Sequence, residues 1–164
     1  MDVIGFQLDD VLDLAIQMET NGAEFYELAA RSASNTATRL LLNGLAAMER
    51  EHGAAFIAMK ERLAGGAGHA DPEADAAVSS FLAAWLKGDV FDRDTRAASA
   101  VARSGTFAAI LGVAVQMEKD SVTFYSGLRQ YIADDEAEKV LDRIIREELR
   151  HVADLDSARR DNLA

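Results

Sequence analysis

The chain carries the same pattern of carboxylates and imidazoles twice. Each copy has a glutamate, a second glutamate 30 residues later, and a histidine three positions after that. A shift of 99 residues converts the first set into the second: Glu19, Glu49 and His52 become Glu118, Glu148 and His151. Because a fixed-period repeat in sequence signals repeated structure, the chain is expected to contain one structural unit twice.

The repeat extends beyond these six residues. Residues 15–26 and 114–125 are identical at six of twelve aligned positions. Only two copies are present, and both are rich in residues that favour helix. The repeat therefore predicts a duplicated helical hairpin and not a solenoid, which needs at least three stacked units.

Apolar residues at three- and four-residue spacing predict four long helices. They cover about 8–32, 36–64, 107–131 and 134–160. Ser104 or Thr106 is expected to cap the third, and Asp134 or Asp135 the fourth.

The segment between the two hairpins is expected to hold a short helix of its own. Asp71 and Pro72 form a typical helix start, and this helix should reach about Leu86. A helical turn is expected at Ala97–Val101, and Trp85 is expected to seat the short helix on the bundle or on a partner.

Together these elements predict an all-α fold, a four-helix bundle made of two duplicated helical hairpins. We expect one domain over 1–164, with hairpin one at about 8–64 and hairpin two at about 106–160. The crossover of about 65–105 is long enough to let the second hairpin pack with the same internal arrangement as the first.

Composition narrows the classes of partner. The net charge of −11 and the pI near 4.6 argue against binding to nucleic acid or to anionic membranes. With no cysteine, disulfides and Cys-ligated metal centres are excluded within this chain. The first residues lack the features of a signal peptide, and no apolar run approaches the length of a membrane span, so a cytoplasmic protein is expected.

The repeated glutamates and histidines lie on the apolar stripes of their helices. Residues at i and i+3 are neighbours on a helix surface, so each Glu-x-x-His pair can converge on one ion. Buried unpaired carboxylates are costly, and no Lys or Arg lies on these stripes. Two divalent ions would balance four carboxylates with both histidines neutral, and oxygen and nitrogen ligands suit iron, manganese or zinc.

Other polar residues near the pattern are assigned lesser roles. Tyr26 and Tyr125 lie two turns after the first glutamate of each copy. They are interpreted as core residues, as hydrogen-bond donors to ligand carboxylates of the opposite half, or as electron donors. His69 lies in a glycine-rich loop and is expected to be exposed. The acids that flank the pattern on other helix faces are left out of the ligand set: Glu24, Glu51 and Glu147.

The phrases Ala-Ile-Gln-Met-Glu-(x)5-Phe-Tyr and Met-Glu-Arg-Glu-His, with their second-half counterparts, resemble the rubrerythrin branch of the ferritin-like superfamily. The resemblance covers nearly the whole chain and implies a ferritin-like bundle. It implies that six residues are iron ligands: Glu19, Glu49, His52, Glu118, Glu148 and His151. It also implies that Glu49 and Glu148 bridge the two ions.

Two departures from that family qualify the resemblance. Many rubrerythrins carry a C-terminal rubredoxin domain, which this cysteine-free chain lacks, so electrons are expected from a separate protein. Many also carry an extra carboxylate one turn after the second-half glutamate, where this chain has Ser121. This substitution argues against the ligand switching of rubrerythrins.

These features predict a dinuclear, di-iron oxidoreductase that reacts with hydrogen peroxide or dioxygen. Two alternatives stay open: an iron-handling protein that oxidises ferrous iron as its substrate, and a non-catalytic bundle stabilised by metal. A homodimer is also expected, supported by apolar crossover residues such as Val90 and Phe91.

Overall fold

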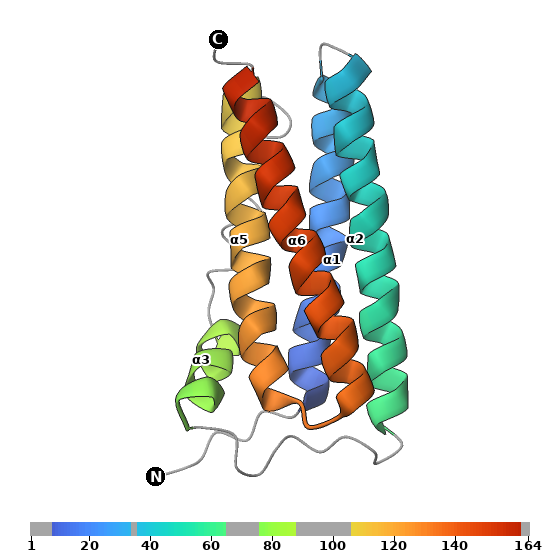
Figure 1. The fold of residues 1–164 in the computed structure, drawn as a ribbon, viewed down its shortest axis with the longest axis vertical. Coiled ribbons are helices and arrows are strands. Elements are labelled where there is room, and N and C mark those ends of the chain that lie inside the picture. The colour runs from blue at the N-terminus through green and yellow to red at the C-terminus, as the bar shows by residue number, and fades with distance from the viewer. Residues whose placement is uncertain (1–7, 34–35, 65–75, 88–105, 162–164) are drawn as a thin grey trace.

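The computed structural model describes residues 8–33, 36–64, 76–87 and 106–161, and within these ranges it contains helices and no β-strand. The described residues form four long helices: α1 (Leu8–Ser32), α2 (Thr36–Arg62), α5 (Phe107–Tyr131) and α6 (Asp135–Asp161). A shorter helix, α3 (Ala76–Lys87), lies beside α5 at one end (Figure 1). The all-α four-helix bundle is confirmed, and the limits of the long helices agree with prediction to within two residues.

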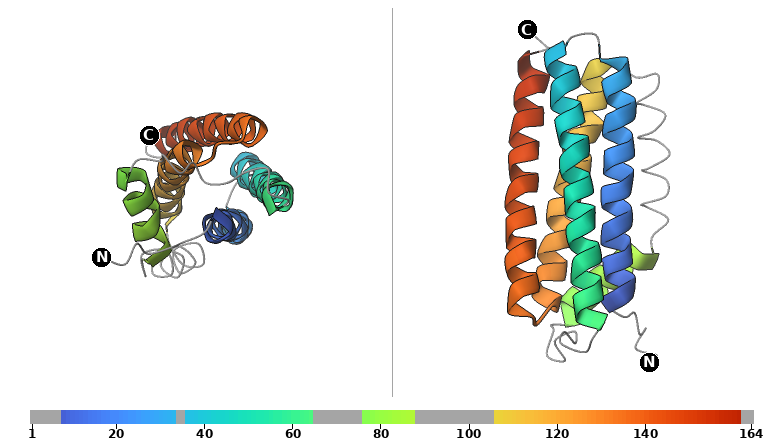
Figure 2. Two further views of the ribbon diagram at one scale, coloured as in Figure 1. Left: turned by 90° about the horizontal axis from the view of Figure 1, so that it is seen from below. Right: turned by 90° about the vertical axis from the view of Figure 1, so that its right-hand side faces the viewer.

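The long helices form two hairpins. Helix α1 packs along α2, and α5 packs along α6. The end-on view shows the two hairpins facing each other across the bundle axis, with α3 on the outside against α5 (Figure 2). This arrangement lets the inward stripes of all four long helices meet at one level.

Side-chain caps fix where the second hairpin's helices begin. The Thr106 hydroxyl accepts a hydrogen bond from the Ala109 amide at 3.3 Å, at the start of α5. The Asp134 carboxylate accepts one from the Ala137 amide at 2.8 Å, at the start of α6, and also pairs with Arg62 at the end of α2. Of the alternative caps, the structure therefore uses Thr106 and Asp134, because their side chains reach the free amides of the first turn.

The core consists of two apolar clusters separated along the bundle axis. One is built on residues such as Leu12, Phe56 and Leu141, and the other on residues such as Phe25, Leu45 and Leu155. On α1, residues of the first cluster extend to Met18 and those of the second begin at Phe25, and the other long helices show the same interruption. The interruption falls at the level of the repeated glutamates and histidines, so apolar layers cover this level on both sides.

Helix α3 is fixed to the bundle by aromatic contacts. The Trp85 ring lies 5.3 Å from the Phe124 ring, and Phe81 lies 6.2 Å from Trp85, as measured between ring centroids. Leu82 is fully buried. A Cβ atom added to Gly127 on α5 would lie only 2.5 Å from Phe81 Cε1, so the absent side chain is what lets α3 approach. Trp85 therefore seats the crossover helix on this bundle.

Replacing Gly127 with alanine is expected to displace α3 and to destabilise the protein by about 1–3 kcal/mol, the usual cost of overpacking. Gly112→Ala on the same helix is the matched control, because its added Cβ would meet no atom of another described element within 4 Å. That control should stabilise the helix by about 0.5–1 kcal/mol. Urea unfolding followed by the fluorescence of the single tryptophan, Trp85, measures both effects. Equal stability and equal emission in the two variants would contradict this docking.

Several predictions fall outside the described residues: the Asp71–Pro72 helix start, the turn at 97–101, the loop position of His69, and the proposed dimer residues Val90 and Phe91. Within the described ranges, none of the helices combines the length and the apolar character needed to cross a bilayer.

Candidate metal centre

The repeated glutamates and histidines are all buried at the middle of the bundle. Each long helix contributes at least one of them, and the two Glu-x-x-His helices, α2 and α6, contribute two each. The exposed fractions are 1% for Glu19, 4% for Glu49, 3% for His52, 2% for Glu118, 0% for Glu148 and 2% for His151. Burial this complete of four acids requires compensation by protons, by cations or by both.

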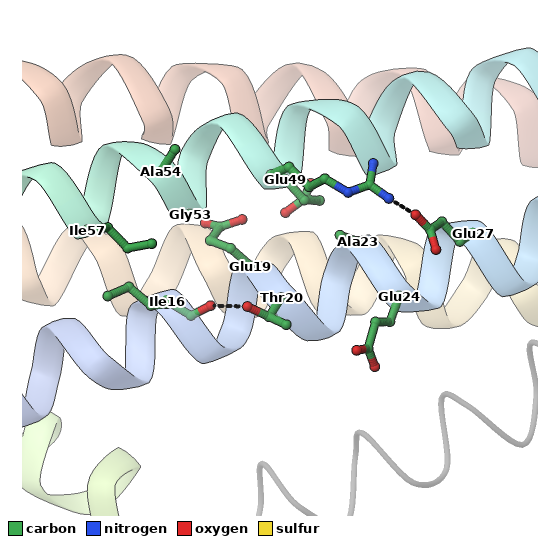
Figure 3. A pocket seen from close by; sticks show the side chains of 11 residues that line it. Ile16, Glu19, Thr20, Ala23, Glu24, Glu27, Glu49, Gly53, Ala54 and Ile57 are labelled. Carbon is green, nitrogen blue, oxygen red and sulfur yellow. Dashed lines mark hydrogen bonds and ion pairs between the residues drawn. The ribbon is translucent and has the colours of Figure 1, made fainter.

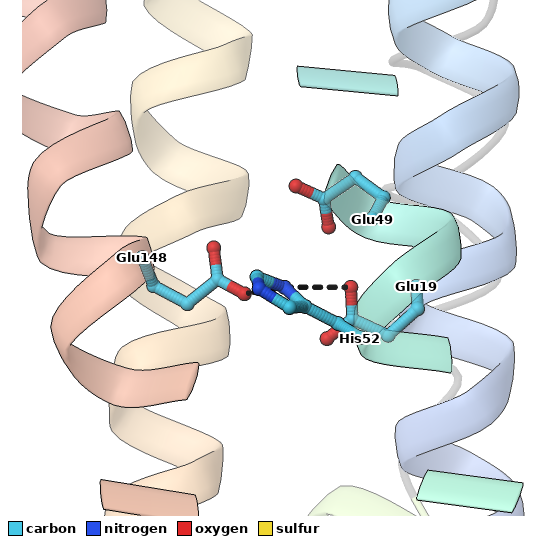
Figure 4. A group of neighbouring side chains, drawn as sticks. All are labelled: Glu19, Glu49, His52 and Glu148. Carbon is cyan, nitrogen blue, oxygen red and sulfur yellow. Dashed lines mark ion pairs between the residues drawn. The ribbon is translucent and has the colours of Figure 1, made fainter. Parts of the chain in front are cut away.

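The six side chains form two overlapping groups. In each group, one oxygen or nitrogen atom per residue lies within 4.8 Å of the others. The first group is Glu19, Glu49, His52 and Glu148, and the second is Glu49, Glu118, Glu148 and His151. Figure 4 shows the first group, with the carboxylates of α1, α2 and α6 directed toward one another around His52. Glu49 and Glu148 belong to both groups, which is the arrangement expected of carboxylates that bridge two ions.

Both imidazoles turn their Nδ1 atom toward the carboxylates. His52 Nδ1 lies 2.8 Å from Glu148 Oε1 and 3.8 Å from Glu19 Oε2. His151 Nδ1 lies 2.9 Å from Glu148 Oε2 and 3.4 Å from Glu118 Oε2. The ring centroids are 5.9 Å apart. The Glu148 carboxylate thus lies between the two histidines, with one oxygen facing each.

Several buried polar atoms that face this cluster lack ordinary partners. Within the described residues, Glu19 Oε2 and Glu49 Oε1 have no hydrogen-bond donor, although both are shielded from solvent. An added Cβ on Gly22 would lie 3.2 Å from Glu49 Oε2, so a glycine at that position leaves room beside the carboxylate. Buried acceptors without donors are rare in folded proteins, and a bound cation removes the anomaly.

Without an ion, protons must hold the cluster together. Burial raises the pKa of Glu19 and Glu49, and it raises the pKa of Glu118 to about 8. Burial alone would lower the pKa of both histidines, but the neighbouring carboxylates outweigh it and raise the pKa of His52 to about 9 and of His151 to about 10.

Glu148 differs from the other three acids. Burial alone would raise its pKa, but the hydrogen bond from His151 and the close approach of the His52 imidazole bring that pKa below its usual range. The metal-free centre at neutral pH therefore holds two imidazolium groups around an ionised Glu148, with the Glu118 carboxyl protonated.

The two tyrosines link the hairpins through this cluster. The Tyr26 hydroxyl donates a hydrogen bond to Glu118 Oε1, and the Tyr125 hydroxyl donates one to Glu19 Oε1 at 2.5 Å. Each bond joins α1 to α5, and both rings are almost fully buried. Burial raises the pKa of both phenols well above the usual value, so they are neutral donors. These bonds agree with the interpretation of the tyrosines as hydrogen-bond donors to carboxylates of the opposite half. Electron donation by the rings stays a prediction.

The sequence pattern predicts that Glu147 lies outside the centre, but the structure brings it into contact with a predicted ligand. Glu147 Oε2 lies 2.9 Å from His52 Nε2, on the side of the ring away from the carboxylate cluster. The repeat gave no signal for this contact, because the position related to Glu147 by the 99-residue shift is Met48. Glu24 and Glu51, the other flanking acids, are exposed and belong to neither group.

A cavity of 390 Å³ lies at the surface between α1 and α2, beside the cluster. Glu19 and Glu49 form part of its wall together with Gly53 (Figure 3). An ion pair between Arg50 and Glu27 lies at its edge. Of the first group of side chains, Glu19 and Glu49 are therefore the two that border the cavity.

Comparisons with known proteins give a family match and a common fold. Residues 10–158 match the model of the rubrerythrin family. The crystal structure of a protein described as a ferritin-like diiron-carboxylate protein from Thermotoga maritima superposes with a TM-score of 0.68 at 20% sequence identity. The match covers 96% of this chain and 97% of that chain, and it shows a common fold. None of the curated proteins matches the chain.

Proposed function

The chain belongs to the rubrerythrin family, and on that premise we propose that it is an oxidoreductase acting through two metal ions, most simply iron. The observation that carries the proposal is the pair of overlapping buried groups that share Glu49 and Glu148. Each group combines three carboxylates with one imidazole, a donor set that suits iron or manganese and contains no thiolate. Four carboxylates balance the charge of two divalent ions.

The residues present fit such a pair of ions. Glu19 and His52 would hold one ion, Glu118 and His151 the other, and the two shared carboxylates would hold both. The acceptor atoms Glu19 Oε2 and Glu49 Oε1, which lack donors within the described residues, would gain a partner. The tyrosines fix one oxygen of Glu19 and of Glu118 and leave the other oxygen of each carboxylate free to coordinate.

Two bound ferrous ions would supply the two electrons that, with two protons, reduce hydrogen peroxide to two molecules of water, and a separate electron-donor protein would restore them. The chain's own part is to keep the ligands in place and to limit access. Apolar clusters on both sides exclude bulk water from the cluster level. The cavity beside Glu19 and Glu49 then defines the route by which a small oxidant arrives.

Filling this cavity is expected to slow the reaction with peroxide without removing the ions. Ala54 lines the cavity and is exposed, so Ala54→Phe should obstruct its mouth and lower the second-order rate constant by about tenfold, which corresponds to about 1.4 kcal/mol. Stopped-flow absorbance of the anaerobic ferrous protein measures the rate.

Ala47→Phe is the matched control, because Ala47 is exposed on the same helix but does not line the cavity. Both variants should bind as much metal as the parent protein. Equal rates for the two variants would place the access route elsewhere.

The iron-oxidising alternative is favoured by one observation, the acidic wall of the same cavity. Glu24 and Glu27 join Glu19 and Glu49 there, with Arg50 as the basic residue. Such a surface attracts cations as well as admitting a neutral oxidant. In this alternative, ferrous iron enters by the cavity as the substrate and leaves after oxidation.

One experiment separates these functions. The protein is loaded anaerobically with ferrous iron, its stoichiometry is measured, and it is mixed separately with peroxide and with dioxygen. Faster oxidation by peroxide supports the peroxidase, whereas faster reaction with dioxygen and turnover of iron beyond the bound amount support iron oxidation. Bound metal that reacts with neither oxidant would overturn both and leave a bundle stabilised by metal.

A further inference from the structure

The two histidines of the centre differ in what their outer nitrogen contacts. His52 Nε2 lies 2.9 Å from Glu147 Oε2, whereas His151 Nε2 is buried and has no hydrogen-bond partner within the described residues. Glu147 extends from α6 to a histidine on α2, so the contact joins the two hairpins. Its side chain is 22% exposed. The near-symmetry of the repeat is therefore broken at this contact.

The sequence explains why only one of the two histidines has this carboxylate partner. Glu147 directly precedes the shared carboxylate Glu148, and the corresponding residue before Glu49 is Met48. A carboxylate is a strong hydrogen-bond acceptor, whereas a thioether sulfur is a weak one. The first half of the chain consequently has no carboxylate at the position from which Glu147 reaches the histidine of the other hairpin.

A carboxylate on the outer nitrogen changes how a histidine binds metal. When Nε2–H donates to Glu147, the neutral ring of His52 has its lone pair on Nδ1, the atom that faces Glu148 and Glu19. The hydrogen bond also holds the ring orientation and raises the basicity of Nδ1. His151 needs the same tautomer, but its Nε2–H would be buried with no acceptor among the described residues, which costs free energy.

We propose that Glu147 is a positioning residue that makes the two metal positions unequal. The ion held by Glu19 and His52 binds more tightly than the ion held by Glu118 and His151, so the centre fills in a fixed order. The position of the cavity supports the same order of filling, because Glu19 lines it and Glu118 does not. The inference rests on the proposed dinuclear function and adds an order of loading to it.

The test is a titration of metal-free protein with cobalt(II), whose visible absorbance reports binding in carboxylate and imidazole sites without turnover. The parent protein should show two steps with dissociation constants at least tenfold apart. Glu147→Met, which copies the residue of the other half, should weaken the tighter step by about 10- to 100-fold and bring the two steps together. Glu147→Gln keeps a neutral acceptor and should fall between the parent and the methionine variant.

Two comparisons separate positioning from a general effect on the fold. Glu51→Gln removes an exposed carboxylate beside His52 in sequence and should leave both steps unchanged. In a His52→Ala background, Glu147→Met should have no further effect on cobalt binding, whereas in a His151→Ala background it should keep its full effect. A double-mutant cycle of this kind isolates the coupling between Glu147 and His52. Thermal unfolding of each metal-free variant verifies that it is folded.

The outcomes distinguish this inference from the function on which it rests. Failure of the parent protein to bind about two cobalt ions per chain would overturn the dinuclear function itself. Two ions bound with equal affinity would overturn the unequal positions and leave the function intact. The positioning role would also be overturned if Glu147→Met weakens binding equally in the His52→Ala background, since Glu147 would then act through the fold.

Discussion

Replacing either shared carboxylate with alanine is expected to remove both metal ions, whereas replacing Glu19 is expected to remove chiefly one. Glu49 and Glu148 belong to both groups of potential ligands, and Glu19 belongs to one. Loss of Glu148 also leaves His52 and His151 without the carboxylate that lies 2.8 and 2.9 Å from their Nδ1 atoms. Metal analysis after equilibrium dialysis should therefore give close to zero ions per chain for Glu148→Ala and about one for Glu19→Ala.

Glu24→Ala is the control for this series. Glu24 is an exposed acid on α1 near the same cavity, and it belongs to neither group. Its replacement should leave about two ions bound. If Glu148→Ala retains two ions, or if Glu19→Ala loses both, the assignment of shared and unshared ligands is wrong.

The parts of the structure that repeat with a fixed period could be predicted from the sequence. The apolar stripe around Glu19 fixes which face of α1 turns inward, and the 99-residue shift carries the same reasoning to Glu118 on α5. Because i and i+3 residues share a helix face, Glu49 and His52 had to point into the bundle together. Helix periodicity therefore predicts that all six side chains point into the bundle.

Contacts that depend on the reach of one side chain could not be predicted from the sequence periodicity. Glu147 lies beside the inward stripe of α6, and its carboxylate reaches His52 only because α2 passes close to it at that level. Periodicity describes the face of one helix and says nothing about the offset between two helices. The cavity beside Glu19 has the same origin, since its wall combines side chains of α1 and α2.

The metal-free protein is expected to lose stability as the pH rises from about 6.5 to 9. The pKa of His52 is raised to about 9 and that of His151 to about 10, and each imidazolium stabilises the fold through the carboxylates around it. That stability is fully present below the ordinary histidine pKa of about 6.5 and is lost as the pH rises through the folded-state values. Thermal unfolding in the presence of a chelator should show Tm falling by on the order of 10 °C, which corresponds to several kcal/mol.

Glu118 also lowers the stability of the metal-free protein as the pH rises. Its pKa is raised to about 8 by burial, so the unfolded chain ionises first and the folded state is penalised increasingly between about pH 4.5 and 8. Glu118→Gln should remove this part of the pH dependence and leave the histidine part. The variant is the control that separates the two contributions.

Metal loading should abolish or reverse the fall in stability with rising pH. Bound divalent ions replace the protons, because the ligands must be deprotonated to coordinate, and binding therefore strengthens as the pH rises. The Tm of zinc-loaded protein, in which the ion is redox-inert, should stay level or increase between pH 6.5 and 9 while that of the metal-free protein falls. The difference between the two Tm values should thus widen with pH. A difference that is constant across this range would mean that protons do not hold the metal-free centre, and that the buried carboxylates are compensated in another way.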